Sequence, residues 1–97
     1  MATYVVLFNF TDQGIRNVKD TTKRADTFKQ VAKSAGVNVK DMYWTLGQYD
    51  IIAIIDAPDD AVVTVLGLSL GKLGNVRTQT LRAFSQAEMD AVLNKVP

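Results

Sequence analysis

The segment IIAIID at residues 51–56 places apolar side chains at five successive positions, and this run strongly limits the possible folds. Side chains alternate between the two faces of a β-strand, so Ile52 and Ile54 lie on one face and their apolar neighbours on the other. A strand with one face in water alternates apolar and polar residues instead. We therefore predict that both faces of this strand are covered.

Residues 3–9 show the same two-sided pattern near the start of the chain. The segment is rich in β-branched and aromatic residues, which predicts a strand, and it lacks the basic leader and cleavage site of a signal peptide. Its apolar side chains fall on both faces: Tyr4, Val6 and Phe8 on one, Val5 and Leu7 on the other.

Residues 11–36 predict a helix. Thr11 is a suitable N-cap, apolar residues recur at steps of three and four, and Gly36 is a suitable C-terminal cap. Thr21 and Thr22 are poor helix formers, so a kink is expected near them.

The remaining segments complete an alternating series of strands and helices. The turn GQYD joins two predicted strands into an antiparallel hairpin, and Pro58 starts a helix that ends near two glycines. The expected elements are strands over residues 37–46 and 51–56, a helix over 58–70, and a strand over 76–84.

The last predicted helix has the clearest start signal. Ser85 and Glu88 fit a capping box, and Phe84 and Met89 fit a hydrophobic staple. The order β-α-β-β-α-β with an extra C-terminal helix predicts a ferredoxin-like α+β fold, with helices on one face of a four-stranded antiparallel sheet.

Two helices cover only one face of such a sheet, whereas the sequence asks for two covered faces. The simplest cover is the sheet of a second copy, which gives a symmetric dimer with a barrel-like interior. The alternative is a monomer in which the C-terminal helix folds across the second face.

Composition excludes several kinds of site. The 97 residues suit one domain, residues 1–97, and they contain no cysteine and no histidine. Disulfides, thiolate chemistry and histidine general bases are therefore excluded, and neither a cofactor nor a metal site is expected. The net charge of +1 and the short apolar runs favour neither nucleic acid nor membrane as a partner. A cytoplasmic protein is expected.

The runs YWTLGQYDIIAIIDAPDD and LGNVRTQTLRAFS resemble the GYD-domain family, small bacterial proteins named for a Gly-Tyr-Asp signature. Gly47, Tyr49 and Asp50 take the signature positions, with Gln48 inserted. The resemblance covers essentially the whole chain and implies a dimeric α+β barrel. It does not imply a particular activity.

The signature hairpin supplies the first candidate site. Tyr49 could orient a ligand at a pocket mouth, and Asp50 could act as a base or hydrogen-bond acceptor. In the structural alternative, which we favour, Gly47 allows the turn, Asp50 bonds nearby backbone amides and Tyr49 caps the core.

The predicted fourth strand supplies the second. Thr78, Thr80 and Arg82 share one face, and Arg77 and Gln79 share the other. A cavity-facing arginine, which the sequence leaves open as Arg77 or Arg82, could hold a carboxylate through its planar guanidinium, although edge strands also carry arginine for solubility. Tyr43 is a further candidate beside such an arginine. Asn9 and Trp44 are secondary candidates, although asparagine is equally natural beside a turn and tryptophan is more often a core or interface anchor than a ligand-stacking residue.

Other polar clusters are assigned to structure. Asp56, Asp59 and Asp60 suit the N-terminus of a helix better than a metal site, and GLSLGKLGN has the wrong spacing for a phosphate loop. The basic residues of the first helix predict a solvated face.

The expected function is that of a small homo-oligomer that binds a small organic molecule in a barrel cavity or serves as an assembly module. The alternative, which the resemblance to dimeric α+β barrels implies, is a cofactor-independent monooxygenase or isomerase. In that case Trp44 and Tyr49 would position the substrate, Asp50 would act as base, and Arg82 would stabilise an oxyanion.

Overall fold

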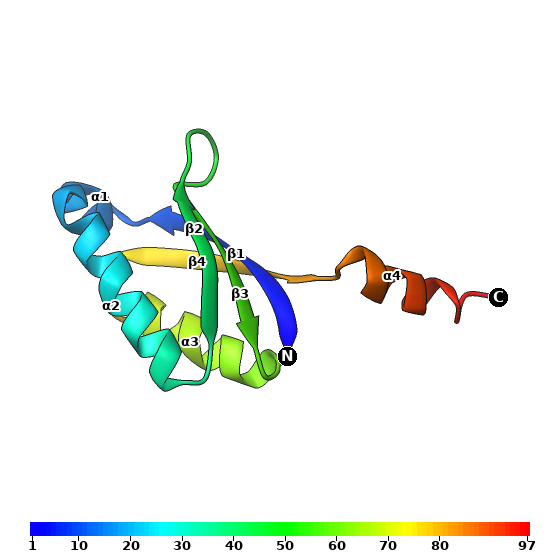
Figure 1. Ribbon diagram of the computed structural model, residues 1–97. Coiled ribbons are helices and arrows are strands. Elements are labelled where there is room, and N and C mark those ends of the chain that lie inside the picture. The colour runs from blue at the N-terminus through cyan, green and yellow to red at the C-terminus, as the bar shows by residue number, and fades with distance from the viewer.

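The computed structural model describes residues 1–97 and alternates strands and helices along the chain (Figure 1). The elements, in order, are β1 (Ala2–Phe10), α1 (Asp12–Arg16), the 3-10 turn η1 (Val18–Asp20), α2 (Thr21–Ser34), β2 (Asn38–Trp44), β3 (Ile51–Ala57), α3 (Asp60–Lys72), β4 (Val76–Ala83) and α4 (Gln86–Leu93).

The four strands form one antiparallel sheet in the order β2-β3-β1-β4. The two strands with apolar residues on both faces, β1 and β3, are therefore the central pair, with Val5 opposite Ile54 and Leu7 opposite Ile52. This confirms the predicted ferredoxin-like α+β fold with an appended helix.

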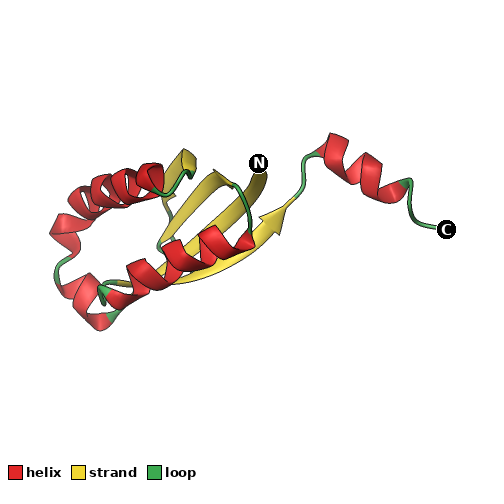
Figure 2. Ribbon diagram, turned by 90° about the horizontal axis from the view of Figure 1, so that it is seen from below, coloured by secondary structure: helices red, strands yellow, loops and turns green.

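The hydrophobic core lies between the sheet and the helices α2 and α3 (Figure 2). Phe8 of β1 meets Phe28 of α2 edge to face, with ring centroids 5.7 Å apart. Val63 and Leu66 bring α3 onto the same core, and Ile55 of β3 is fully buried. The core thus occupies one face of the sheet.

The predicted first helix is divided in the structure. Thr11 caps α1 by accepting a hydrogen bond from the Gly14 amide, and the helix then stops at Arg16. The chain passes through η1 before α2 begins at Thr21. The break therefore comes just before the two threonines at which the kink was expected.

The N-terminus of α1 is fastened to the turn between α3 and β4. The Thr11 amide donates to the Asn75 carbonyl at 3.1 Å, and the Gln13 side chain donates to the Leu73 carbonyl and the Asn75 side chain. Gly14 is buried against this turn, so closely that a Cβ there would lie 1.9 Å from the Asn75 carbonyl oxygen. Only glycine fits at this crossing.

The opposite face of the sheet carries no helix. Val5, Leu7, Ile52 and Ile54 point to this face and are half-buried. Helix α4 does not fold across it, because β4 carries the chain away from the sheet and α4 projects beyond it (Figures 1 and 2). The molecule is consequently elongated, with extents of 51 × 30 × 19 Å. We call this uncovered side the open face.

Candidate functional site

The signature hairpin is anchored to β1 through Asp50. Its amide donates to the Phe8 carbonyl at 2.9 Å, and its carboxylate accepts the Phe10 amide hydrogen at 2.8 Å. Its carbonyl also accepts from the Thr45 amide, which closes the loop between β2 and β3. Gly47 has a φ of +104°, a conformation that side-chain-bearing residues rarely adopt. Asp50 therefore prolongs the pairing of β3 with β1 beyond Ile51.

Tyr49 leans from this loop across the sheet. Its hydroxyl donates to the Gln79 side-chain oxygen of β4 at 2.9 Å, and its carbonyl accepts from the Thr45 hydroxyl at 2.7 Å. Because β1 lies between β3 and β4, the tyrosine reaches from the loop before β3, across β1, to β4. Gln79 pairs with Leu7, so the bridge lies on the open face.

The open face combines an apolar centre with this polar margin. Its apolar part is formed by the following side chains: Val5 and Leu7 of β1, Ile52 and Ile54 of β3, and Leu81 of β4. Tyr43 of β2, opposite Ile52, adds a ring that is 56% exposed. A contiguous apolar surface of this kind is typical of a site for protein contact.

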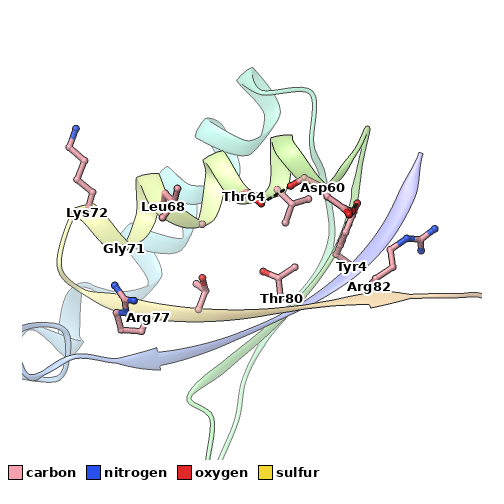
Figure 3. A pocket seen from close by; sticks show the side chains of 12 residues that line it. Tyr4, Asp60, Thr64, Leu68, Gly71, Lys72, Arg77, Thr80 and Arg82 are labelled. Atoms are coloured by element: carbon pink, nitrogen blue, oxygen red, sulfur yellow. Dashed lines mark hydrogen bonds between the residues drawn. The ribbon is translucent and has the colours of Figure 1, made fainter.

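A groove lies on the other side of the sheet, between α3 and β4 (Figure 3). Its volume is about 640 Å³. Thr80 and Arg77 rise toward α3 from β4, and Gly71 of α3 faces them. The groove and the open face are therefore on opposite sides of the molecule.

Tyr4 and Asp60 close one end of the groove. The Tyr4 hydroxyl donates to the Asp60 carboxylate, and the tyrosine is only 3% exposed. This hydrogen bond, with burial adding to it, raises the pKa of the Tyr4 phenol above its usual value of 10.0. The phenol therefore stays protonated and remains a donor at neutral pH.

Arg82 connects this end of the groove to α4. Its guanidinium donates to the carbonyls of Thr3 and Ala83, lies 3.7 Å from the Glu88 carboxylate, and stacks 4.4 Å from the Phe84 ring centroid. These contacts direct the start of α4.

Glu88 and Ser85 form the predicted capping box of α4. The Glu88 carboxylate accepts the Ser85 amide hydrogen at 2.9 Å, and the Glu88 amide donates to the Ser85 hydroxyl at 3.1 Å. Hydrogen bonds from Ser85, assisted by Arg82, lower the pKa of the Glu88 carboxyl below its usual 4.5. The helix start is thus well specified, yet Met89 and Leu93 remain exposed.

The structure distributes the candidate residues over both sides of the sheet. Tyr49 lies on the open face, as do Tyr43 and Asn9 by their strand register. Thr78, Thr80 and Arg82 pair with Phe8, Val6 and Tyr4, so they share the helix-covered side. Trp44 also lies on that side, where its indole donates to the Thr21 hydroxyl at 3.0 Å.

The residues of the alternative enzyme interpretation are consequently not brought together within one chain. Trp44 and Tyr49 lie on opposite sides of the sheet, Asp50 is bonded to the β1 backbone, and Arg82 is bonded near α4. Within the single chain, Thr78, Thr80 and Arg82 therefore lie on the opposite side of the sheet from Tyr43 and Tyr49. Register with β1 decides which side each residue of β4 faces.

Two groove residues are not among the candidates that the sequence suggests, because Tyr4 occupies an apolar strand position and Asp60 suits the charge at a helix N-terminus. Arg77 is one of the two arginines of the fourth strand between which the sequence leaves the choice open. Arg77 pairs with Asn9, but its long side chain curls around the edge strand toward Gly71 (Figure 3). The four-residue spacing of Gly67 and Gly71 could have indicated the groove, since it places two residues without side chains on the same face of α3.

No three carboxylate side chains gather closely enough to hold a metal ion. No helix has both the length and the apolar character needed to cross a membrane.

Comparison with known proteins agrees with the signature geometry. The GYD-domain family pattern matches residues 4–93. The chain belongs to the GYD-domain family. Among relatives of this GYD protein is one from Thermus thermophilus named glutamine synthetase and cystathionine beta-lyase binding protein. It is 34% identical over 94 residues, which are 96% of this chain and 99% of the relative.

The fold of this GYD protein also occurs in a solved structure. The crystal structure of FFRP-DM1 superposes with a TM-score of 0.60 at 19% sequence identity, covering 87% of this chain and 100% of the other. At this identity the likeness concerns the fold alone. Together the comparisons show a GYD-domain protein and agree with its ferredoxin-like fold.

Proposed function

We propose that the chain is a single-domain, homo-oligomeric adaptor that binds metabolic enzymes, and that two copies associate through their open faces. The observation that carries the proposal is the uncovered apolar side of the sheet. Ile52 and Ile54 lie on it in a central strand, and no helix of the chain packs over them. Burying apolar area is the main favourable term in protein association.

The enzyme partners are proposed from the relative. Its name states that it binds glutamine synthetase and cystathionine beta-lyase, and it aligns with almost the whole chain. We propose enzymes of the same two classes as partners for this chain. A cytoplasmic location, expected from the sequence, forms part of the same proposal.

Helix α4 provides a second protein-contact surface in this proposal. Met89, Val92 and Leu93 of α4 follow the i, i+3, i+4 spacing of a helix that docks into a groove, and Val96 follows just beyond the end of the helix. The four side chains are between 41% and 61% exposed. A helix of this length is marginal in water without packing, so a bound partner would stabilise it.

The test uses the chain together with glutamine synthetase and cystathionine beta-lyase from the organism that encodes it. Purified chain is mixed with each enzyme, and the complexes are resolved by size-exclusion chromatography. Co-elution with either enzyme supports the proposal. Loss of co-elution in Leu93→Glu, but not in a control variant Val65→Glu on α3, would assign the contact to α4. If neither enzyme binds, the proposed partners are wrong.

A second candidate is the small organic ligand expected in the barrel interior. If two open faces meet, Tyr49, Gln79 and Tyr43 of each copy would border the space between the sheets. The polar bridge from Tyr49 to Gln79 favours this candidate, because it places hydrogen-bonding groups beside an apolar surface. Native mass spectrometry of the purified oligomer should then show a retained small molecule that is reduced in Tyr49→Phe. A ligand-free oligomer would speak for assembly alone.

The enzyme alternative has no such support. The residues it needs are separated or already bonded, as described above, and no observation favours it over binding.

A further inference from the structure

Beyond Val76, which belongs to the core, the side of β4 that faces α3 is polar, unlike the same side of the other strands. In β1 and β3 this side is formed by apolar core residues such as Val6 and Ala53. The β4 residues paired with Val6 and Phe8 are Thr80 and Thr78. Their hydroxyls make no hydrogen bond within the chain, and Thr80 is exposed although it points toward a helix. The core is thus left unfilled along this edge strand.

The space between α3 and β4 stays unfilled because two residues of α3 that face β4 are glycines. A Cβ at Gly67 would lie 3.4 Å from the Thr78 hydroxyl, and a Cβ at Gly71 would lie 3.6 Å from a guanidinium nitrogen of Arg77. Any longer side chain at these positions would fill the groove. Its volume of about 640 Å³ lies within the range of small-molecule sites.

The charges along the groove are unequal. Three cations line it, Lys72, Arg77 and Arg82, against one carboxylate, Asp60. The Asp60 carboxylate accepts from Tyr4, and Arg82 is bonded near α4.

Arg77 is the unpaired cation that lies inside the groove, since Lys72, which is also without an ion pair, extends from α3 away from β4 (Figure 3). Its guanidinium forms no ion pair and no hydrogen bond within the chain. It points across the groove toward Gly71 (Figure 3). An arginine in this position offers a planar pair of donors to an oxyanion.

We propose that this groove binds a small organic molecule through a carboxylate or phosphate group. The guanidinium of Arg77 and the hydroxyl of Thr78 hold the oxyanion, and Lys72 at the rim adds positive potential. The rest of the molecule lies along β4 over Thr80, where Gly67 leaves room. The site lies on the helix-covered side, so it stays open when two open faces associate and does not depend on the proposed enzyme partners.

The test is an amide NMR titration of the full chain with inorganic phosphate and, in parallel, with succinate, at constant ionic strength maintained with chloride. Saturable shifts are expected at the amides of Gly71, Arg77 and Thr78 with at least one probe. The probe that binds more tightly identifies the ligand as a phosphate or a carboxylate.

Two variants from opposite walls make the result specific. Arg77→Gln removes the charge and the paired donors that hold the oxyanion, and is expected to weaken binding by about tenfold, which corresponds to about 1.4 kcal/mol. Gly71→Leu fills the groove, keeps every charge and is expected to abolish binding. Arg16→Gln on α1 removes an equal charge elsewhere and should leave binding unchanged.

The proposal is overturned by either of two results. One is the absence of saturable shifts with both probes. The other is the same response in Arg77→Gln and Gly71→Leu as in the unaltered chain, which would indicate non-specific ion binding. The oligomeric state of each variant, measured in the same samples, reports separately on the proposed association through the open face.

Discussion

Asp50 is the signature residue whose role the structure describes most directly. The sequence leaves two interpretations of it, a base at a pocket mouth and a backbone anchor. In the structure the carboxylate accepts the Phe10 amide hydrogen and the Asp50 amide donates to the Phe8 carbonyl. One residue therefore binds β1 at two points and leaves Tyr49 directed onto the open face.

Replacing Asp50 should cost stability. We expect Asp50→Ala to lower the free energy of unfolding by about 1.5–3 kcal/mol, because the Phe10 amide loses a charged acceptor. Asp50→Asn keeps an acceptor oxygen and should cost less. Urea denaturation followed by circular dichroism measures both changes. Asp26→Ala, which removes an exposed carboxylate of α2, is the control. Equal stability of the Asp50→Ala and Asp26→Ala proteins would contradict the anchoring role of Asp50 and leave ligand binding as its interpretation.

At the scale of elements, two junctions hold the helices in place. Helix α1 meets the α3–β4 turn at Gly14, and α4 is attached to β4 through Arg82 and its capping box. The first junction is set by close packing and the second by charge and hydrogen bonds. They should therefore respond to different perturbations.

The α1 junction should not tolerate a side chain. In Gly14→Ala the new Cβ would lie 1.9 Å from the Asn75 carbonyl oxygen, so backbone must move. We expect a loss of about 1–3 kcal/mol in the free energy of unfolding. Gly71→Ala is the matched control, since its Cβ makes only ordinary contact at 3.6 Å and helix propensity improves. Thermal unfolding that ranks the two variants equally would contradict this packing.

The α4 junction should weaken in acid. The folded-state pKa of Glu88 lies below its unfolded value near 4.5, so the charged carboxylate stabilises the helix start above pH 4.5. This contribution is lost as the pH falls through the lower, folded pKa. NMR shifts of the Ser85 amide and the Met89 methyl group should follow that titration.

Glu88→Gln provides the control for this titration. The amide oxygen can still accept from the Ser85 amide, but it does not titrate, so the Ser85 and Met89 signals should be insensitive to acid. An unaltered chain whose Ser85 signal does not move on acidification would contradict a capping role for the charge.

Much of the element structure could be predicted because local signals agreed with the tertiary fold. The apolar periodicity of β1 and β3, the Thr11 cap and the Ser85–Glu88 capping box all depend on neighbours in sequence. The sides occupied by the β4 residues were not predictable in the same way. They depend on the register of an edge strand with β1, and Arg77 reaches the groove by curling around that edge. Nor does local sequence determine the direction of α4, which follows from contacts of Arg82 with Thr3 and Glu88.

At the scale of the whole molecule, one chain leaves two apolar surfaces without cover. The open face lies opposite the core, and α4 projects beyond the sheet with its apolar stripe exposed. The alternative in which α4 covers the open face is not the arrangement found. The groove between α3 and β4 lies apart from both surfaces. Association and small-molecule binding are therefore separable properties of this chain.

The central claim is that the open face is an interface between copies, and size-exclusion chromatography with multi-angle light scattering tests it most directly. We expect the unaltered chain to elute as a dimer or higher oligomer at micromolar concentration. Ile54→Lys on the open face should shift it to monomer, whereas the control Val65→Lys on α3 should not. An unaltered chain that remains monomeric throughout this concentration range would contradict the claim.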